Sequence, residues 1–318
     1  MGGCRRDLLL AVFAVALISI VVTYTPAAQG ATASTNSGAA ASGATYVGSD
    51  ICQGCHQEQT AKYAKTKMAK VFASAARTPA EKQGCEGCHG PGSKHVEAGG
   101  GKGVGGLVSF RKGAESAKQQ TAVCQKCHEK GQRVYWEGGP HEGAGVTCTN
   151  CHKVMENVSD KRNFAKETEL ETCFQCHALK KAQLQRSSHM PVREGKLVCT
   201  SCHNPHNSQG PRQLKQNTIN ENCVSCHTER RGPFLWEHPP VVENCGNCHT
   251  PHGSTNPFLL KVRVPRLCQE CHNYSRHPSQ PYDASGSTAN TRVLGRGCVQ
   301  CHPQIHGSNH PSGSMFHR

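Results

Sequence analysis

Ten copies of the pentapeptide Cys-x-x-Cys-His carry the most specific chemistry in this sequence. On a short helical turn, two cysteines three residues apart face the same way, so their sulfurs can form thioethers to the two vinyl groups of one porphyrin. The histidine that follows is then held over the iron as its proximal ligand. The spacing therefore predicts haem of the c type at every copy, and ten covalently bound haems in the chain.

The predicted attachment residues use twenty of the twenty-one cysteines. We expect thioethers at Cys52, Cys55, Cys85, Cys88, Cys124, Cys127, Cys148, Cys151, Cys173, Cys176, Cys199, Cys202, Cys223, Cys226, Cys245, Cys248, Cys268, Cys271, Cys298 and Cys301. The expected proximal ligands are His56, His89, His128, His152, His177, His203, His227, His249, His272 and His302. Zinc ribbons, redox motifs and disulfides also use paired cysteines, but a histidine after every pair favours haem.

The other ten histidines are candidates for the second axial position of each iron, and their number matches complete bis-histidine ligation. They are His95, His141, His189, His206, His238, His252, His277, His306, His310 and His317. For any one of them the alternative is an ordinary surface histidine, and one of the last three, in the C-terminal tail, could be spare. His206 closely follows its own proximal histidine and should not reach the far face of the same porphyrin, so we expect it to ligate a neighbouring haem.

Two methionines stand where axial ligands would be expected. Met155 takes the place after its motif that His206 and His252 take after later motifs, and Met68 follows the first motif. Each is either a packing residue or the ligand of a histidine–methionine haem, whose reduction potential would be raised.

The composition leaves little material for an ordinary hydrophobic core. Aromatic residues are 5% of the chain, the mean hydropathy is −0.57, and there are 33 glycines and 17 prolines. With a leader of about 33 residues removed, about 29 residues remain for each motif. We therefore expect the haems to stack against one another and to serve as the core.

The formal net charge of +14 would ordinarily suggest a nucleic-acid partner. We reject that interpretation, because ten haems with ionised propionates would bring a charge of about −10 to −20 that the basic residues offset. The chain also lacks a basic run and the spacings of known DNA-binding motifs.

Residues 1–33 are typical of a secretory signal, with Arg5 and Arg6 before the apolar run 8–22; an uncleaved anchor is the alternative. Cys4, the cysteine outside the motifs, lies in this leader. Residues 34–48 are expected to form a flexible tether, and 49–318 the haem-binding part. Export agrees with haem attachment outside the cytoplasm, so the predicted location is the periplasm, in association with the outer membrane.

Regular structure is expected to be sparse. Short helices are predicted within 58–76, 161–185 and 292–299, and no stretch alternates well enough to predict a sheet. From Cys124 onward the motifs recur in pairs at similar intervals, with a histidine between the two motifs of three pairs: His141, His189 and His238. The predicted fold is a multihaem cytochrome c, mostly irregular with short α-helices, little or no β-structure and an elongated haem array.

The motifs and their extensions resemble the MtrA/DmsE family of decahaem c-type cytochromes. The resemblance rests on the ten motifs over 52–302, on 88–95 (CHGPGSKH), on 189–191 (HMP), and on the extensions 203–206 (HNPH) and 249–254 (HTPHGS). It implies a periplasmic haem wire in two five-haem halves, about 49–185 and 186–318. It also implies docking within an outer-membrane β-barrel porin, a periplasmic or inner-membrane cytochrome as electron donor, and exchange with extracellular partners, among them an extracellular cytochrome.

Three functions are compatible with these residues. The leading hypothesis is an electron conduit that is not an enzyme, since every iron would have two protein ligands and no open position for a substrate. A soluble periplasmic shuttle to a terminal reductase is the second, and a multihaem reductase the third. The sequence does not determine the direction of electron flow.

Overall fold

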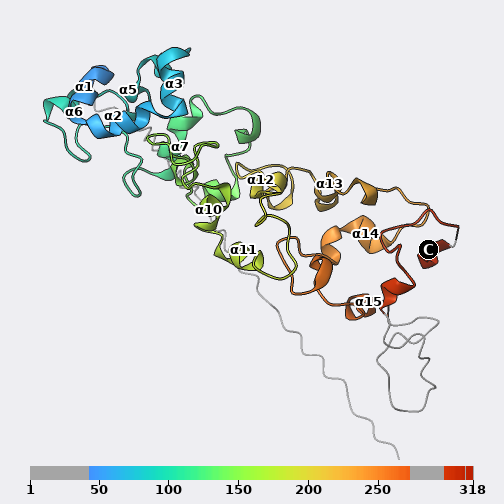
Figure 1. The fold of residues 1–318 in the computed structure, drawn as a ribbon. Helices are drawn as coiled ribbons and strands as arrows, with labels where there is room; N and C mark the ends of the chain where they lie inside the picture. Colours follow the sequence, from blue (N-terminus) through green and yellow to red (C-terminus); the bar gives the residue numbers. More distant parts are fainter. Residues whose placement is uncertain (1–42, 273–296, 312, 318) are drawn as a thin grey trace, which may run out of the picture. The chain divides into compact units, whose positions relative to one another are not determined.

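The computed structural model describes residues 43–272, 297–311 and 313–317 (Figure 1). The chain divides into two units, Met1–Ser37 and Gly38–Arg318, and the described residues all belong to the second. The predicted signal 1–33, most of the tether 34–48, and His277 lie outside the described residues.

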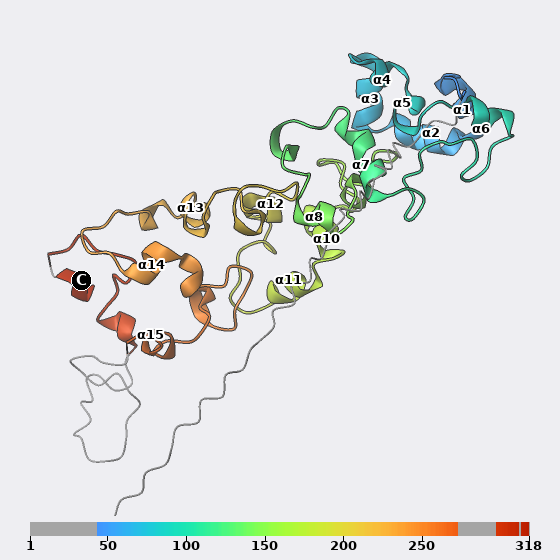
Figure 2. The same cartoon turned by 180° about the vertical axis from the view of Figure 1, so that it is seen from behind.

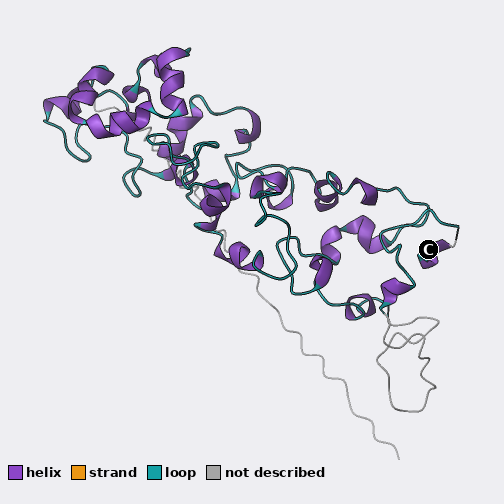
Figure 3. Cartoon of the chain, in the orientation of Figure 1, coloured by secondary structure: helices purple, strands orange, loops and turns teal. Residues whose placement is uncertain are grey.

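Short helices joined by loops make up the described part of the chain, and the longest, α7, has nine residues (Figure 3). The α-helices are α1 (Ser49–Cys55), α2 (Gln57–Ala64), α3 (Lys67–Ser74), α4 (Pro79–Lys82), α5 (Cys85–His89), α6 (Ser93–Glu97), α7 (Ala117–Gln125), α8 (Pro140–Gly143), α9 (Cys148–Cys151), α10 (Glu169–Phe174), α11 (Ala178–Gln183), α12 (Cys199–Cys202), α13 (Ile219–Val224), α14 (Pro239–Glu243) and α15 (Arg266–Gln269). The 3₁₀ turns are η1 (Gly131–Arg133), η2 (Pro211–Gln213), η3 (Thr228–Arg230), η4 (Cys245–Asn247), η5 (Pro257–Leu259), η6 (Cys298–Gln300) and η7 (Gly313–Met315).

Within the described ranges no strand forms, and the β-structure is limited to isolated bridges. The prediction of a mostly irregular fold with short helices is confirmed. The predicted helix over 58–76 is two helices, because the chain leaves α2 at Lys65 and restarts at Thr66, whose buried hydroxyl accepts a hydrogen bond from the Ala69 N–H. The range 161–185 holds α10 and α11 after a loop. Of 292–299, only residues 297–299 are described, and the last two of them begin η6.

The odd-numbered motifs from the third to the seventh begin in the last turn of a helix that a capping box starts. Thr168 and Glu171 cap α10, and Thr218 and Glu221 cap α13, in each case through the threonine hydroxyl and the glutamate carboxylate. Ser116 and Gln119 do the same for α7. The even-numbered motifs at Cys148 and Cys199 instead form single turns of their own, α9 and α12.

Neighbouring elements are joined mainly through polar side chains. The Asn220 side chain on α13 donates hydrogen bonds to the carbonyls of Val241 and Val242 at α14, and the two helices lie side by side in Figure 1 and from behind in Figure 2. Its side-chain oxygen also accepts from the Cys245 N–H, which ties α13 to the start of the eighth motif. Such bonds replace the helix-to-helix apolar contacts of an ordinary bundle.

Few apolar side chains are buried in the described part of the polypeptide. They are Ala69, Trp136, Phe164, Leu184, Val192 and Leu214. Twelve buried polar or charged residues accompany them, among them Glu86, Asn204 and Ser254. Six apolar residues cannot stabilise a unit of this size by themselves. The polypeptide therefore depends on something other than its own side chains for its interior.

Glu86 in α5 is a buried acid that holds the N-terminal segment of the described chain. The residue is only 3% exposed, and its carboxylate accepts hydrogen bonds from the N–H groups of Val47, Gly48 and Gly92, over 2.7 to 3.2 Å. Charge-assisted bonds of this kind are about twice as strong as neutral ones. The contact fixes residues 45–48 against the second motif.

We predict that Glu86→Gln loosens residues 45–48, because an amide has one acceptor oxygen and no charge. A loss of about 2 kcal/mol would raise amide exchange at Val47 and Gly48 about thirtyfold, measured by hydrogen exchange on the holoprotein. Glu97→Gln is the matched control, since Glu97 is 63% exposed in its ion pair with Lys94 and should change nothing. Equal exchange in the two variants would contradict the role of Glu86.

Candidate functional site

Each motif folds as a single turn that places its two sulfurs and its histidine together. The N–H of the histidine donates to the carbonyl of the first cysteine, as in His56 to Cys52 at 2.9 Å and His203 to Cys199 at 3.0 Å. The same bond recurs in nine of the ten motifs, and the tenth lies within α5. All twenty motif cysteines are free of disulfides. This is the arrangement that attachment to one porphyrin requires.

Consecutive motifs are neighbours in space. The first cysteines of paired motifs hydrogen-bond in the pairs Cys52–Cys85, Cys124–Cys148, Cys173–Cys199, Cys223–Cys245 and Cys268–Cys298. Between the pairs, electrostatic interactions link Cys88–Cys127, Cys151–Cys176, Cys202–Cys223 and Cys248–Cys271. The ten motifs thus follow one another in space in the order of the sequence.

The paired thiols also perturb each other. The hydrogen bond to Cys148 and burial raise the pKa of Cys124 well above the ordinary thiol value, and the same bond lowers the pKa of Cys148 to about 7. A pair of adjacent sulfurs loses one proton easily and a second only with difficulty, because two thiolates would repel. Thioether sulfurs carry no proton, so these pKa shifts do not apply once haem is attached. The contacts then show only that the two sulfurs of each pair lie close together.

Six proximal histidines face a second imidazole. The pairs are His56–His95, His141–His177, His152–His206, His203–His252, His238–His272 and His249–His306, with ring centroids 6.0 to 6.3 Å apart. In every pair the second imidazole comes from outside the motif that holds the first, across a long stretch of sequence. The ring planes lie within 23° of parallel except in His141–His177, where the angle is 64°.

These separations are the ones that an iron between two imidazoles would need. Two iron–nitrogen bonds of about 2 Å, with the roughly 1.1 Å from each bonded nitrogen to its ring centre, put the centroids about 6.2 Å apart. Rotation of either ring about the nitrogen–iron axis leaves that distance unchanged, so the pair with the steeper angle is equally suitable. The histidine donors therefore fit haem iron.

Backbone carbonyls set the tautomer of these imidazoles. The Nδ1 atoms of His152, His203 and His249 lie 2.8 to 3.0 Å from the carbonyls of Arg162, Arg212 and Phe258. A carbonyl only accepts, so Nδ1 must carry the proton, and the lone pair is left on Nε2, which can bind a metal. The same bond joins His95 to Val104, His141 to Pro205 and His238 to Ile305.

Burial keeps three of the facing histidines neutral. Loss of water lowers the pKa of His206, His252 and His306 to about 4 in each case, and neighbouring positive charges such as Arg133 beside His206 add to the effect. Each of these rings is therefore unprotonated at neutral pH and becomes charged only as the pH falls toward its lowered pKa. Neutral imidazole is the form that coordinates iron.

A repeated loop frame carries two of the facing histidines, His206 and His252, and recurs once without a histidine. After the motifs at Cys148, Cys199 and Cys245 the chain leaves, turns through two consecutive left-handed residues, and returns to bridge its own proximal histidine. The bridges are His152 to Phe164, His203 to Leu214 and His249 to Leu260. We name these the motif-4 loop (153–163), the motif-6 loop (204–213) and the motif-8 loop (250–259). The closing pairs of hydrogen bonds have almost the same lengths in all three, 2.7 to 2.9 Å.

Not every predicted ligand has a partner of this kind. His206 lies opposite His152, two motifs upstream, and not opposite its own His203. The Nε2 atom of His189 lies 3.0 Å from a Glu194 carboxylate oxygen, and the ring centroid of His317 lies 4.5 Å from that of His302, too close for an iron between the rings. The backbone N–H of His310 donates to the Ser308 hydroxyl.

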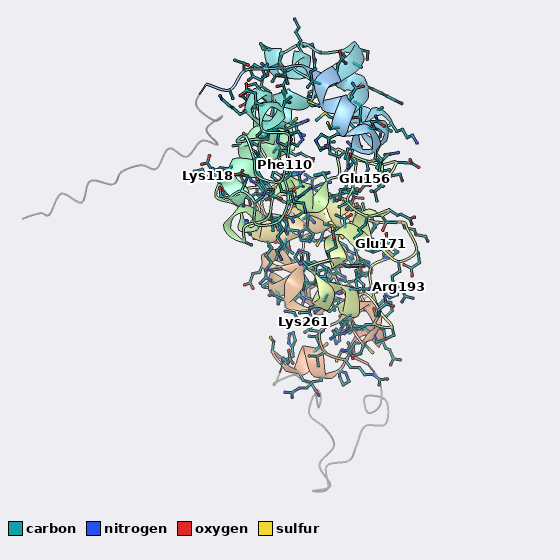
Figure 4. All side chains as sticks on the ribbon, turned by 90° about the vertical axis from the view of Figure 1, so that its left-hand side faces the viewer. Phe110, Lys118, Glu156, Glu171, Arg193 and Lys261 are labelled. Carbon is teal, nitrogen blue, oxygen red and sulfur yellow. The ribbon has the colours of Figure 1, made fainter. Side chains whose placement is uncertain are left out.

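Among the described residues no imidazole faces His89, His128 or His227 at the iron-spanning distance. Phe110, labelled in Figure 4, instead packs edge-on against His89, with centroids 5.4 Å apart. Of the two candidate methionines, Met68 is half-buried in α3 and Met155 is 42% exposed in the motif-4 loop.

Sequence reasoning missed the residues that orient the ligands. The carbonyls of Arg162, Arg212 and Phe258 belong to left-handed residues that are not glycines, so no composition signal marked them. Trp136 lies beside the facing histidine His206, with ring centres 6.3 Å apart and ring planes tilted by 53°. Its Trp-Glu context could have indicated this role, because the same context precedes His238.

Fold and site together define a multihaem c-type cytochrome: single-turn haem-attachment motifs in spatial succession, with imidazoles facing each other across the distance of an iron. Comparison with known protein families agrees with this class. The doubled CXXCH motif family matches residues 189–232 and 238–277, and the family described as "Cytochrome c-type protein NrfB-like" matches 85–168.

Two relatives extend the comparison. The chain is 40% identical to "Multiheme cytochrome MtrA" of Shewanella baltica (strain OS185) over 277 residues, which cover 85% of this chain and 81% of that protein. It is 26% identical over 130 residues to "Cytochrome c-type protein NrfB" of Escherichia coli O6:H1, covering 40% of this chain and 64% of that protein. The chain belongs to the MtrA-type multihaem cytochrome family, binds haem c and transfers electrons.

We predict that His206→Ala opens one axial position on the haem of the fourth motif, since His206 faces His152. The haem at that one motif should then change from low-spin to high-spin ferric iron, measured by electron paramagnetic resonance on the purified holoprotein. Gln209→Ala, an exposed change in the same loop, is the control and should leave the spectrum unaltered. A fully low-spin spectrum for His206→Ala would show that His206 is not a ligand.

Proposed function

We propose that the chain binds ten haems c at its ten motifs and carries electrons across the outer membrane, inside a porin-type β-barrel, to or from extracellular partners. The observation that supports the proposal most directly is the spatial succession of the motifs, from Cys52–Cys85 at one end of the order to Cys268–Cys298 at the other. A conduit needs every carrier next to the following one, and a break at any step would stop it.

Haem, when bound, supplies an iron that gains or loses one electron without a bond being made to a substrate. The residues of this chain then do three things. The motif turns keep successive attachment sites adjacent. The facing imidazoles would hold the iron from the side opposite the proximal histidine and would leave no site for a substrate at those motifs. The Nδ1 bonds to backbone carbonyls hold the Nε2 atoms in place, so that little rearrangement accompanies each change of charge.

Proximal histidines that already face a second imidazole support a role in electron transfer over one in catalysis. A multihaem reductase needs an open position at one iron at least. Six of the ten proximal histidines face a second imidazole here, and every motif ends in histidine. We therefore propose that the chain is not an enzyme.

The location and partners rest on the family resemblance and on the leader. The basic n-region and apolar run of 1–33 are typical of export, and c-type haem is attached outside the cytoplasm. No helix among the described residues is long and apolar enough to cross a membrane. We propose the periplasm as the location, a cytochrome of the periplasm or inner membrane as one partner, and a barrel protein as the other.

A soluble periplasmic shuttle is the second candidate. The likeness of residues 85–168 to the NrfB-like family supports it, because that match covers only part of the array and is shared with a smaller c-type cytochrome. In this alternative the same wire would reduce a soluble partner, with no barrel around it.

We predict that the native protein purifies from outer membranes in complex with a barrel protein and contains ten haems per chain. The haem content is measured by the pyridine haemochrome assay and by intact mass. The complex, reconstituted in liposomes, should let an enclosed reduced dye reduce ferric iron outside, while liposomes with the barrel protein alone are the control. Recovery of all the protein in the soluble periplasmic fraction would favour the shuttle.

A further inference from the structure

The facing histidines of the loops follow a fixed offset of two motifs. In the motif-6 loop, His206 faces the proximal histidine of the fourth motif. In the motif-8 loop, His252 faces that of the sixth, and after the tenth motif His306 faces that of the eighth. The segment that follows each even motif from the sixth onward thus places a histidine opposite the proximal histidine of the preceding even motif. Applied to the motif-4 loop, the same offset predicts that this loop supplies a ligand to the second motif, whose proximal histidine is His89.

The motif-4 loop has the same frame as the other two but no histidine. Lys153 N–H donates to Asn163 at 2.7 Å and Ala165 N–H to Cys151 at 2.8 Å, matching Asn204 to Gln213 and Lys215 to Cys202 in the motif-6 loop. The third residue after the proximal histidine is His206 in one loop and Met155 in the other. Met155 therefore stands in the ligand position of a loop whose backbone is folded to present a ligand.

The histidines between paired motifs follow a second offset. His141 lies between the third and fourth motifs and faces the proximal histidine of the fifth, and His238 lies between the seventh and eighth and faces that of the ninth. In each case the histidine follows one motif and faces the proximal histidine of the second motif after that one. Met68 lies between the first and second motifs, at a similar spacing after His56. The rule points from Met68 to the third motif, whose proximal ligand is His128.

The segment with Met68 also docks where the equivalent segments dock. The linker with His141 contacts the motif-6 loop through the Asn207 side chain and the Tyr135 carbonyl at 2.9 Å. The linker with His189 bridges the motif-8 loop at Ser188 and Ser254.

The other two linkers repeat this relation. The linker with His238 bridges the loop after the tenth motif at Trp236 and Ser308. Lys67, next to Met68, donates to the carbonyl of Asp160 in the motif-4 loop at 2.9 Å. All four linkers thus dock on the loop after the second motif of the following pair, and the first one brings Met68 to the loop that carries Met155.

The set of proximal histidines without a facing imidazole agrees with both offsets. The described residues place no imidazole opposite His89, His128 and His227, whereas His302 has the ring of His317 beside it. The second offset assigns His189, which lies between the fifth and sixth motifs, to His227. The two that remain, His89 and His128, are the two to which the methionines point. Met155 also packs into no core of the polypeptide, since it is 42% exposed.

We propose that Met155 is the axial ligand of the second haem and Met68 that of the third, so that two adjacent haems have histidine–methionine ligation within an otherwise bis-histidine array. A thioether sulfur is a softer and less basic donor than imidazole, so it favours ferrous iron and raises the reduction potential. Cys88 and Cys127, which interact electrostatically, make these two sites neighbours. Electrons would then reside preferentially on the haems of the second and third motifs.

The test compares the oxidised holoprotein with Met155→Leu, Met68→Leu and Met315→Leu by near-infrared magnetic circular dichroism. Leucine keeps the volume and removes the sulfur. We expect a methionine-to-ferric-iron band in the native protein, about half of it in each of the first two variants and none in the double variant. Met315→Leu changes an exposed side chain that neither offset assigns to a haem, so it is the control and should keep the full band.

Met155→His gives a second measurement, which would not change if Met155 were only a packing residue. It should keep the iron six-coordinate and low-spin, remove half of the band and lower one step of the redox titration. Absence of the band from the native protein, or its survival in the double variant, would overturn the proposal. The inference rests on haem ligation and not on passage across the outer membrane, so either can fail while the other holds.

Discussion

The distance between two facing imidazoles is the constraint on which this structure depends. Rings held with their centroids 6.0 to 6.3 Å apart join chain segments that lie far apart in the sequence, such as those of His152 and His206. The polypeptide offers few other long-range apolar contacts, with six buried apolar side chains among its described residues. An iron between each pair would bind both segments at once, and so perform the work that a hydrophobic core performs elsewhere.

That constraint explains why the loops are built from backbone bonds. Each loop must present one side chain to a distant motif and also hold its own proximal histidine, and the left-handed pair Arg212 and Gln213 does both by turning the Arg212 carbonyl toward His203. A second ligand taken from another motif makes every unit depend on its neighbours. The array therefore resembles a repeat protein, in which no unit completes its own site.

Much of the site was predictable because it is local. A Cys-x-x-Cys-His turn is closed by one backbone bond, so the sequence determines which sulfurs and which histidine lie together. The break at Thr66 was not predicted, because the propensities of 58–76 are helical throughout and a single buried hydroxyl interrupts them. The distal histidines could be counted but not paired, since His252 faces His203 across a stretch of chain that holds the seventh and eighth motifs.

The sequence by itself determined that the chain binds haem c and that the fold is irregular, because thioether chemistry needs only residue types at a fixed spacing and a chain poor in apolar residues cannot build a core. Only the tertiary structure decided which segments face each other. The offset of two motifs arises from loops that fold back on their own motif and linkers that dock on the following pair, as Lys67 does at Asp160. Such contacts join common residue types that lie far apart in the sequence, so no local sequence pattern predicts them.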